Sequence, residues 1–283
     1  MSTSCVFPLA AEDAFRLARQ AGFDCIEVMV TQHRETQDAG ALLALSARYG
    51  LPIASIHAPV LPLAQFVWGG GPRGKLIGAA ELAVAVGATV VVAHPPFFWE
   101  PRYAREFTTL VREIERDYEL TVAVENMFPL SLGPARIAVH SPSPDATLID
   151  CESLTLDFSH AAVAGRDALE LAIAMGKRLR HVHLCDGTVG EGRLIDEHLV
   201  PGHGSQPVAE VIRYLSAGGW DGSLIAEVHA PHGSSEVELL AALSETVTYA
   251  RAALGAPSST GLPTLAPQSR ENRAKVGKSV KVS

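Results

Sequence analysis

The sequence predicts an α/β protein that folds as a (β/α)8 TIM barrel. Eight short apolar runs alternate with segments of helical periodicity over most of the 283 residues. Several runs are nearly continuous in Val, Ile, Leu and Ala, as is typical of parallel strands covered on both faces. Histidines and carboxylates recur at the ends of these runs, which is where a parallel barrel holds its functional groups.

The eight runs define the predicted strands. In chain order they are Ser4–Phe7, Cys25–Val30, Ile53–His57, Thr89–His94, Leu120–Glu125, Leu154–Phe158, His181–Cys185 and Leu224–Val228. A doubly wound open sheet is the alternative, but it would gather its ligands at one switch point of the sheet. Here six of the eight strands, or the loops after them, carry candidate ligands, which favours the closed barrel.

Three sets of apolar residues have the spacing of one helix face. They are Phe107, Leu110, Val111 and Ile114; Val208, Val211, Ile212 and Leu215; and Val237, Leu240 and Leu243. The second helix is expected to stop at Gly218-Gly219, since glycine commonly follows a helix end. The third is expected to run to about residue 254.

Composition suggests one barrel domain over residues 1–254, followed by a tail over 255–283. The chain is 47% hydrophobic and 19% charged, which is ordinary for a globular protein. The tail is rich in Ser, Pro and Thr and carries five basic residues against one glutamate, so we expect a disordered basic segment. The formal net charge of −8 is that of the whole chain, and because the tail is basic, the barrel alone is more negative than this value.

Charge and hydropathy also limit the partners. An acidic body makes a nucleic-acid partner unexpected, because phosphate binding needs a basic face. No apolar stretch is long enough to span a membrane, and the N-terminus lacks a secretory pattern. The four cysteines have no CxxC spacing and are expected to be reduced thiols in a cytoplasmic protein. We expect a small-molecule substrate, and the sequence leaves a homodimer open.

Nine residues at or just after the strand ends are candidate metal ligands. They are His57, His94, Glu125, Asp157, His160, His183, Asp196, His198 and Glu227. So many carboxylates and imidazoles at one end of a barrel would repel or stay unsatisfied without a cation. The mixture suits Zn²⁺ or Mn²⁺ first, with Co²⁺, Fe²⁺ or Mg²⁺ as alternatives, and is too rich in nitrogen for Ca²⁺. Nine candidates could hold two or three ions, or one ion with histidines left for substrate.

Four further residues stand out near these ligands. Trp68 and Trp99 lie in loops expected at the top of the barrel, where they could form an apolar lid over a small substrate. Arg193 could pair with a substrate phosphate or carboxylate. Glu27 lies in a predicted strand and is expected to be a buried structural carboxylate rather than a catalyst.

The residues resemble the xylose isomerase-like TIM-barrel superfamily, in its sugar phosphate isomerase/epimerase branch. The resemblance covers about residues 1–254 and is most specific in 156–160, 181–186, 196–204 and 226–228. It implies a metal set of Glu125, Asp157, His183 and Glu227, with the two glutamates as the catalytic acid and base. It also implies that His160 contacts substrate, and His57 and His94 are further candidates for that role.

Endonuclease IV shares the superfamily, and its trinuclear zinc motifs match all nine candidate ligands. A zinc-dependent phosphodiesterase acting on abasic DNA is therefore the alternative function. Two departures weaken it: the loop after His57 is apolar, and Phe158-Ser159 replaces the usual Thr-Cys. A barrel that binds a ligand without turnover is a further alternative.

Overall fold

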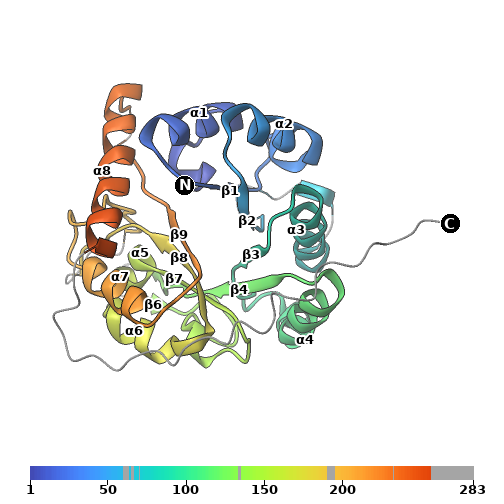
Figure 1. Cartoon of the computed structure of the whole chain (residues 1–283). Helices are drawn as coiled ribbons and strands as arrows, with labels where there is room; N and C mark the ends of the chain where they lie inside the picture. Colours follow the sequence, from blue (N-terminus) through green and yellow to red (C-terminus); the bar gives the residue numbers. More distant parts are fainter. Residues whose placement is uncertain are drawn as a thin grey trace.

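The computed structural model describes residues 1–59, 64, 67–69, 71–132, 135–189, 195–231 and 233–255. Seven parallel strands form a nearly closed barrel, and helices surround it (Figure 1). The strands, in their order around the sheet, are β1 (Ile26–Met29), β2 (Ile53–His57), β3 (Val90–Ala93), β4 (Thr121–Glu125), β7 (Leu154–Asp157), β8 (Leu179–Leu184) and β9 (Ser223–Ala226). This arrangement confirms the predicted barrel fold.

The gap between β9 and β1 is bridged by the first two residues of the chain. Ser2 forms a parallel bridge with Glu27 of β1, and its N–H donates to the Ala226 carbonyl of β9 at 2.8 Å. The Glu27 N–H donates in turn to the Met1 carbonyl at 2.9 Å. An extended dipeptide therefore occupies the eighth strand position and closes the ring.

The prediction of a first strand at Ser4–Phe7 was wrong. These residues overlap a 3-10 turn, Thr3–Val6, which the Ser2 hydroxyl caps by accepting the Ser4 N–H at 3.3 Å. Cys5 and Val6 are buried in this turn, so their apolar character does not distinguish it from a strand. The other seven predicted strands coincide with β1 to β4 and β7 to β9 within a few residues.

Helices connect the strands and cover the outside of the barrel. They are α1 (Ala11–Ala21), α2 (Ala39–Tyr49), α3 (Pro72–Val86), α4 (Pro101–Tyr118), α5 (Phe158–Ala164), α6 (Ala168–Met175), α7 (Val208–Ala217) and α8 (Glu236–Gly255). The predicted faces of α4 and α7 are buried, and α7 ends at Ala217, directly before Gly218. The face predicted for α8 is displaced: Leu243 is buried, but Val237 is exposed because Leu239 turns inward instead.

The core lies between the strands and the helices. Phe15 of α1, Phe107 of α4 and Phe158 of α5 are among its largest fully buried side chains. Burying each such side chain stabilises the fold by roughly 1.5–3 kcal/mol. A short antiparallel hairpin, β5 (Leu130–Leu132) with β6 (Ala135–Ile137), follows β4 and was not predicted. No described helix is both long and apolar enough to cross a membrane.

Candidate metal centre

The candidate ligands gather because parallel strands end at the same rim of the barrel. His57, Glu125 and Asp157 are the last residues of β2, β4 and β7. His94 and Glu227 directly follow β3 and β9. Neighbouring strands pair in parallel, and Asp157 of β7 lies opposite His183 of β8. The rim therefore concentrates side chains that are far apart in the sequence.

Three carboxylate ligands converge around the imidazole of the fourth, His183. Its Nδ1 lies 2.8 Å from Glu227 Oε2, 3.2 Å from Glu125 Oε1 and 3.6 Å from Asp157 Oδ2. One ligand atom from each of these four residues lies within 4.8 Å of the others. All four residues are buried. This is the set that the resemblance to the epimerase branch implies.

Glu125 is the most crowded of these carboxylates. Its Oε2 lies 3.4 Å from His57 Nε2 and 3.1 Å from His94 Nε2, and its Oε1 lies 3.0 Å from His160 Nδ1. The ring of His57 stacks on that of His183 at 5.5 Å. Glu125 thus joins three histidines to the four-ligand group.

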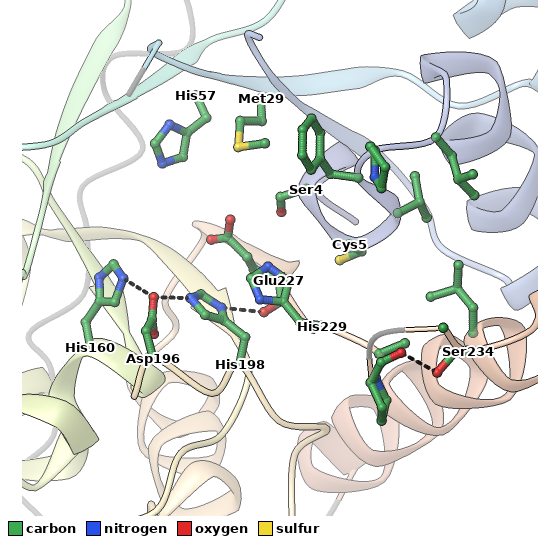
Figure 2. A pocket seen from close by; sticks show the side chains of 18 of the residues that line it. Ser4, Cys5, Met29, His57, His160, Asp196, His198, Glu227, His229 and Ser234 are labelled. Atoms are coloured by element: carbon green, nitrogen blue, oxygen red, sulfur yellow. Dashed lines mark hydrogen bonds and ion pairs between the residues drawn. The ribbon is translucent and has the colours of Figure 1, made fainter. Parts of the chain in front are cut away.

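A second group lies beside the first. Asp196 Oδ2 lies 3.3 Å from His160 Nε2 and 3.1 Å from His198 Nε2, as Figure 2 shows. The other Asp196 oxygen accepts the Ser159 hydroxyl proton at 2.6 Å. His198 Nδ1 contacts the Glu227 carbonyl oxygen at 2.7 Å. All nine predicted ligands therefore belong to one continuous cluster.

The cluster changes the proton affinity of its members. Burial alone would raise the pKa of Glu125, but the imidazoles of His183, His94 and His160 outweigh it and hold that pKa well below its ordinary value. His183 shows the converse: burial would lower its pKa, but Glu227, Glu125 and Glu27 raise it well above the usual range. In this arrangement imidazolium groups compensate the carboxylates. A bound divalent cation could compensate the carboxylates instead, and the histidines would then be neutral.

The residues fit such a cation in two further respects. Glu125 Oε2 is buried and makes no regular hydrogen bond among the described residues, although His94 Nε2 and His57 Nε2 lie close to it, so an ion could bind this carboxylate oxygen. Three carboxylates and an imidazole are also a donor set that Zn²⁺ and Mn²⁺ accept. Glu125, Asp157, His183 and Glu227 would hold the first ion, and His160, Asp196 and His198 could hold another.

A cavity of about 590 Å³ opens onto this cluster. One wall carries the ligand side chains (Figure 2). The opposite wall comes from the turn before α1, from the segment before α8 and from the first turn of α8. That opposite wall is mostly apolar and includes Val6, Phe7, Pro8, Leu9 and Leu239. A volume of this size suits a small organic molecule.

The two tryptophans predicted to contact substrate lie away from this cavity. Trp68 packs on α3, and a Cβ built on Gly78 would lie only 2.7 Å from its ring. Trp99 stacks on Phe97 at 4.4 Å and is half exposed. Neither ring is among the described residues that line the cavity. Arg193 lies outside the described residues.

Several residues around the site were not predicted. Cys5 and Met29 line the cavity, and so does His229, whose ring lies 4.5 Å from that of His198. The position of His229, two residues after Glu227 on the same strand end, was a usable signal. Asn126 holds the neighbouring backbone, because its side chain accepts the Asp157 N–H at 2.7 Å and donates to the Asp157 carbonyl at 3.1 Å.

Comparison with known proteins is consistent with this geometry. A family model described as "Xylose isomerase-like TIM barrel" matches residues 15–247. Uncharacterized proteins from Mycobacterium leprae (strain TN) and from Mycobacterium tuberculosis (strain ATCC 25618 / H37Rv) are each 41% identical to the chain over 271 residues. Each alignment covers 89% of this chain and 95% of the relative.

Solved structures share the fold at lower identity. A D-tagatose 3-epimerase-like protein has a TM-score of 0.59 at 24% identity, covering 82% of this chain and 90% of its own. A D-psicose 3-epimerase solved in the presence of D-fructose has a TM-score of 0.65 at 14% identity, covering 90% and 99%. A 3-keto-D-glucoside 4-epimerase from E. coli has a TM-score of 0.63 at 14% identity, covering 89% and 98%. With the family model spanning nearly the whole barrel, the chain belongs to the xylose isomerase-like TIM barrel family.

Proposed function

We propose that the protein is a divalent-metal-dependent isomerase or epimerase of a small, sugar-like polyhydroxy carbonyl compound. One observation carries the proposal: Glu125 and Glu227 reach the same imidazole nitrogen, Nδ1 of His183, from β4 and from the end of β9. Both glutamates also line the cavity. Two carboxylates that share one centre and face one cavity are suited to act as a base and an acid on a single substrate carbon.

The chemistry needs an acidic C–H bond next to a carbonyl. A bound divalent ion supplies it by polarising the carbonyl and the adjacent hydroxyl. One glutamate then removes the proton from carbon, and the other returns a proton to the opposite face. His57, His94 and His160 line the same cavity, which supports our assignment of these residues to the binding of substrate hydroxyl groups. The epimerase names of the structural neighbours support this assignment of reaction class.

Hydrogen exchange tests the proton transfer directly. Glu125→Gln and Glu227→Gln should each keep part of the metal affinity, because an amide oxygen can still coordinate. Turnover should fall by roughly 10²–10⁴-fold, because an amide cannot accept the proton. Exchange of the substrate C–H hydrogen in deuterated water, followed on ketoses and aldoses with Mn²⁺ or Zn²⁺ present, separates the two roles. The variant that lacks the base facing the hydrogen should lose exchange, whereas the other should keep exchange and lose epimerisation.

The matched control is Glu245→Gln, which changes a carboxylate that pairs with His203 on the surface. It should leave exchange and turnover unchanged. Full exchange and turnover in both site variants, with metal retained, would exclude the two glutamates as the catalytic pair. Wild-type protein that binds metal but exchanges no tested carbonyl substrate would instead favour a barrel that binds ligand without turnover.

Hydrolysis of a phosphodiester in abasic DNA is a second candidate. It is favoured by the group of His160, Asp196 and His198 beside the first ligand set, because together they could hold more than one ion. The apolar wall of the cavity opposes it, since the described residues of that wall include no lysine or arginine for a phosphate. Elemental analysis separates the two: about three zinc ions per chain favour the phosphodiesterase, and one or two favour the epimerase. Metal-dependent nicking of abasic duplex DNA that disappears in Glu227→Ala would replace our proposal.

A further inference from the structure

A further buried carboxylate lies inside the barrel, in contact with the ligand cluster. Glu27 of β1 is completely buried. Its Oε2 accepts the Ser55 hydroxyl proton at 2.7 Å and lies 2.9 Å from His181 Nε2. Its Oε1 lies 3.2 Å from Nε2 of His183. Glu27 is not among the residues that line the cavity, so a substrate there does not reach it.

Oε1 of Glu27 and Nε2 of His183 each rely on the other as a polar partner. Neither Glu27 Oε1 nor His183 Nε2 has a regular hydrogen bond within the described part of the chain. Each is the other's close polar neighbour, and both side chains are fully buried. An isolated buried carboxylate is strongly unfavourable, so a charged or hydrogen-bonded neighbour is required.

We propose that Glu27 is a positioning residue for the metal centre, keeping the proton of His183 on Nε2 so that Nδ1 is free to bind the ion. The inference rests on the proposed function, because it takes His183 as a metal ligand. A carboxylate behind a ligating histidine fixes which ring nitrogen carries the proton, orients the ring and strengthens it as a donor.

The two nitrogens of the His183 ring face different groups, and this difference supports the proposed position of the proton. Nδ1 faces Glu125, Asp157 and Glu227, which are the groups that would share the ion. A neutral imidazole that binds metal through Nδ1 must carry its proton on Nε2. On that side Glu27 is the carboxylate within reach, and Ser55 and His181 contact its other oxygen. Glu27 therefore faces His183 from β1, away from the cavity.

The same three residues could instead bind an ion of their own. Atoms of Glu27, His181 and His183 lie within 4.8 Å of one another, as a metal site requires. We favour the positioning role because these residues supply only three donors, whereas a structural zinc site takes four protein ligands. The experiment must distinguish the two.

Zinc affinity of the full chain, measured by competition with a chelating indicator, tests the proposal without reference to turnover. Glu27→Leu should weaken Zn²⁺ binding by roughly 10–100-fold, the usual effect of losing such a carboxylate. Glu27→Gln should fall between wild type and Glu27→Leu, since its amide oxygen accepts the N–H without a charge. In long-range ¹H–¹⁵N spectra of the zinc-loaded wild type, a His183 proton on Nε2 shows that Nδ1 binds the ion, as the proposal requires. The His183 signals are assigned by their loss in His183→Gln.

Thr155→Val is the matched control. Thr155 lies on β7 and is fully buried, and its hydroxyl donates to the Ala123 carbonyl rather than to a ligand side chain. It should leave zinc affinity unchanged, and thermal unfolding identifies any variant that fails to fold. Wild-type zinc affinity in Glu27→Leu, or a His183 proton on Nδ1 in the zinc-loaded wild type, would overturn the positioning role. Loss of one zinc equivalent in both Glu27 variants would overturn it in favour of a buried ion. Unchanged affinity in His183→Gln would show that the proposed metal set itself is wrong.

Discussion

The carboxylate of Asp186 accepts the backbone N–H of Gly204 at 3.0 Å, although 18 residues separate the two in the sequence. The same Oδ2 atom accepts the Gly202 N–H at 2.9 Å, and Oδ1 accepts those of Gly187 and Gln206 at 2.8 and 3.0 Å. Asp186 is buried and follows β8. One side chain therefore fixes both ends of the connection between β8 and α7.

That connection carries Asp196 and His198 into the cavity, so Asp186→Asn should disturb the second ligand group. An amide has one acceptor atom where the carboxylate has two, so at least some of the four N–H groups lose their acceptor. Hydrogen bonds to charged groups contribute roughly 1.5–3 kcal/mol each. We expect the free energy of unfolding to fall by about 2–3 kcal/mol, as measured by urea denaturation. Asp150→Asn, at an exposed ion pair with Arg112, should cost less than about 1 kcal/mol. Equal losses in the two variants would contradict the role given to Asp186.

Gly204 should not tolerate a side chain. A Cβ at this position would lie 2.3 Å from Asp186 Oδ1 and 2.6 Å from the Gly187 carbonyl oxygen. Asp186 Oδ1 is held by the hydrogen bonds described above, and the Gly187 carbonyl oxygen accepts the Ser205 N–H at 3.0 Å. Gly204→Ala should therefore destabilise the protein by roughly 1–3 kcal/mol, as overpacking does. Gly74→Ala is the matched control, because nothing lies within 4 Å of a Cβ there and the position is helical. Its thermal unfolding midpoint should stay level or rise, whereas that of Gly204→Ala should drop.

His140 should make the protein sensitive to acid. Burial lowers the pKa of His140 to about 4, although its Nδ1 contacts the Pro95 carbonyl oxygen at 2.9 Å. In the unfolded chain the pKa is about 6.5, so between these values the unfolded state binds more protons. The stability from keeping His140 neutral is therefore complete above about pH 6.5 and is lost as the pH falls toward 4, by up to about 3 kcal/mol. Urea denaturation with chelator present should show a smaller loss between pH 7 and pH 4 for His140→Phe than for wild type. Parallel pH curves would disprove this assignment.

Removing metal should lower thermal stability. An ion that binds only the folded state stabilises it by about 2.7 kcal/mol at a concentration of one hundred times Kd. For a chain of this size that corresponds to a rise in Tm of roughly 5–10 °C. Differential scanning fluorimetry should show this rise when Mn²⁺ or Zn²⁺ replaces chelator. Glu227→Ala should reduce the rise because it removes one of the four ligands. A Tm that does not respond to either ion in wild type would exclude a metal at this site under the conditions used.

The sequence predicted most of the barrel because its signals are local. Buried parallel strands read as continuous apolar runs, and seven of the eight predicted runs are strands. The prediction at the eighth position failed because Cys5 and Val6 are as apolar in a buried 3-10 turn as they would be in a strand, and Phe7 follows that turn on the surface. The two residues that do bridge the barrel, Met1 and Ser2, have no strand-like pattern. Their pairing depends on partners in β1 and β9, at opposite ends of the sequence.

The site was predictable in composition but not in its surroundings. Each ligand type at a strand end could be identified individually, because a polar residue after a buried run is unusual. The wall opposite the ligands could not, since Leu9, Met29 and Leu239 look like ordinary core residues until the fold brings them together around a cavity. The hydrogen bonds of Asp186 could not be predicted for a similar reason. Its partners are backbone N–H groups, which almost every residue type carries.

Closure of the barrel gives the candidate metal centre a second consequence. Glu227 follows β9, at the seam where only an extended dipeptide joins β9 to β1, whereas Glu125 lies on the far part of the sheet. An ion shared by these two residues would cross-link the last strand to the middle of the ring. Parting of the strands at the seam would then require release of the ion, and by linkage each event would make the other easier. Variants that weaken the seam should therefore bind the ion less tightly.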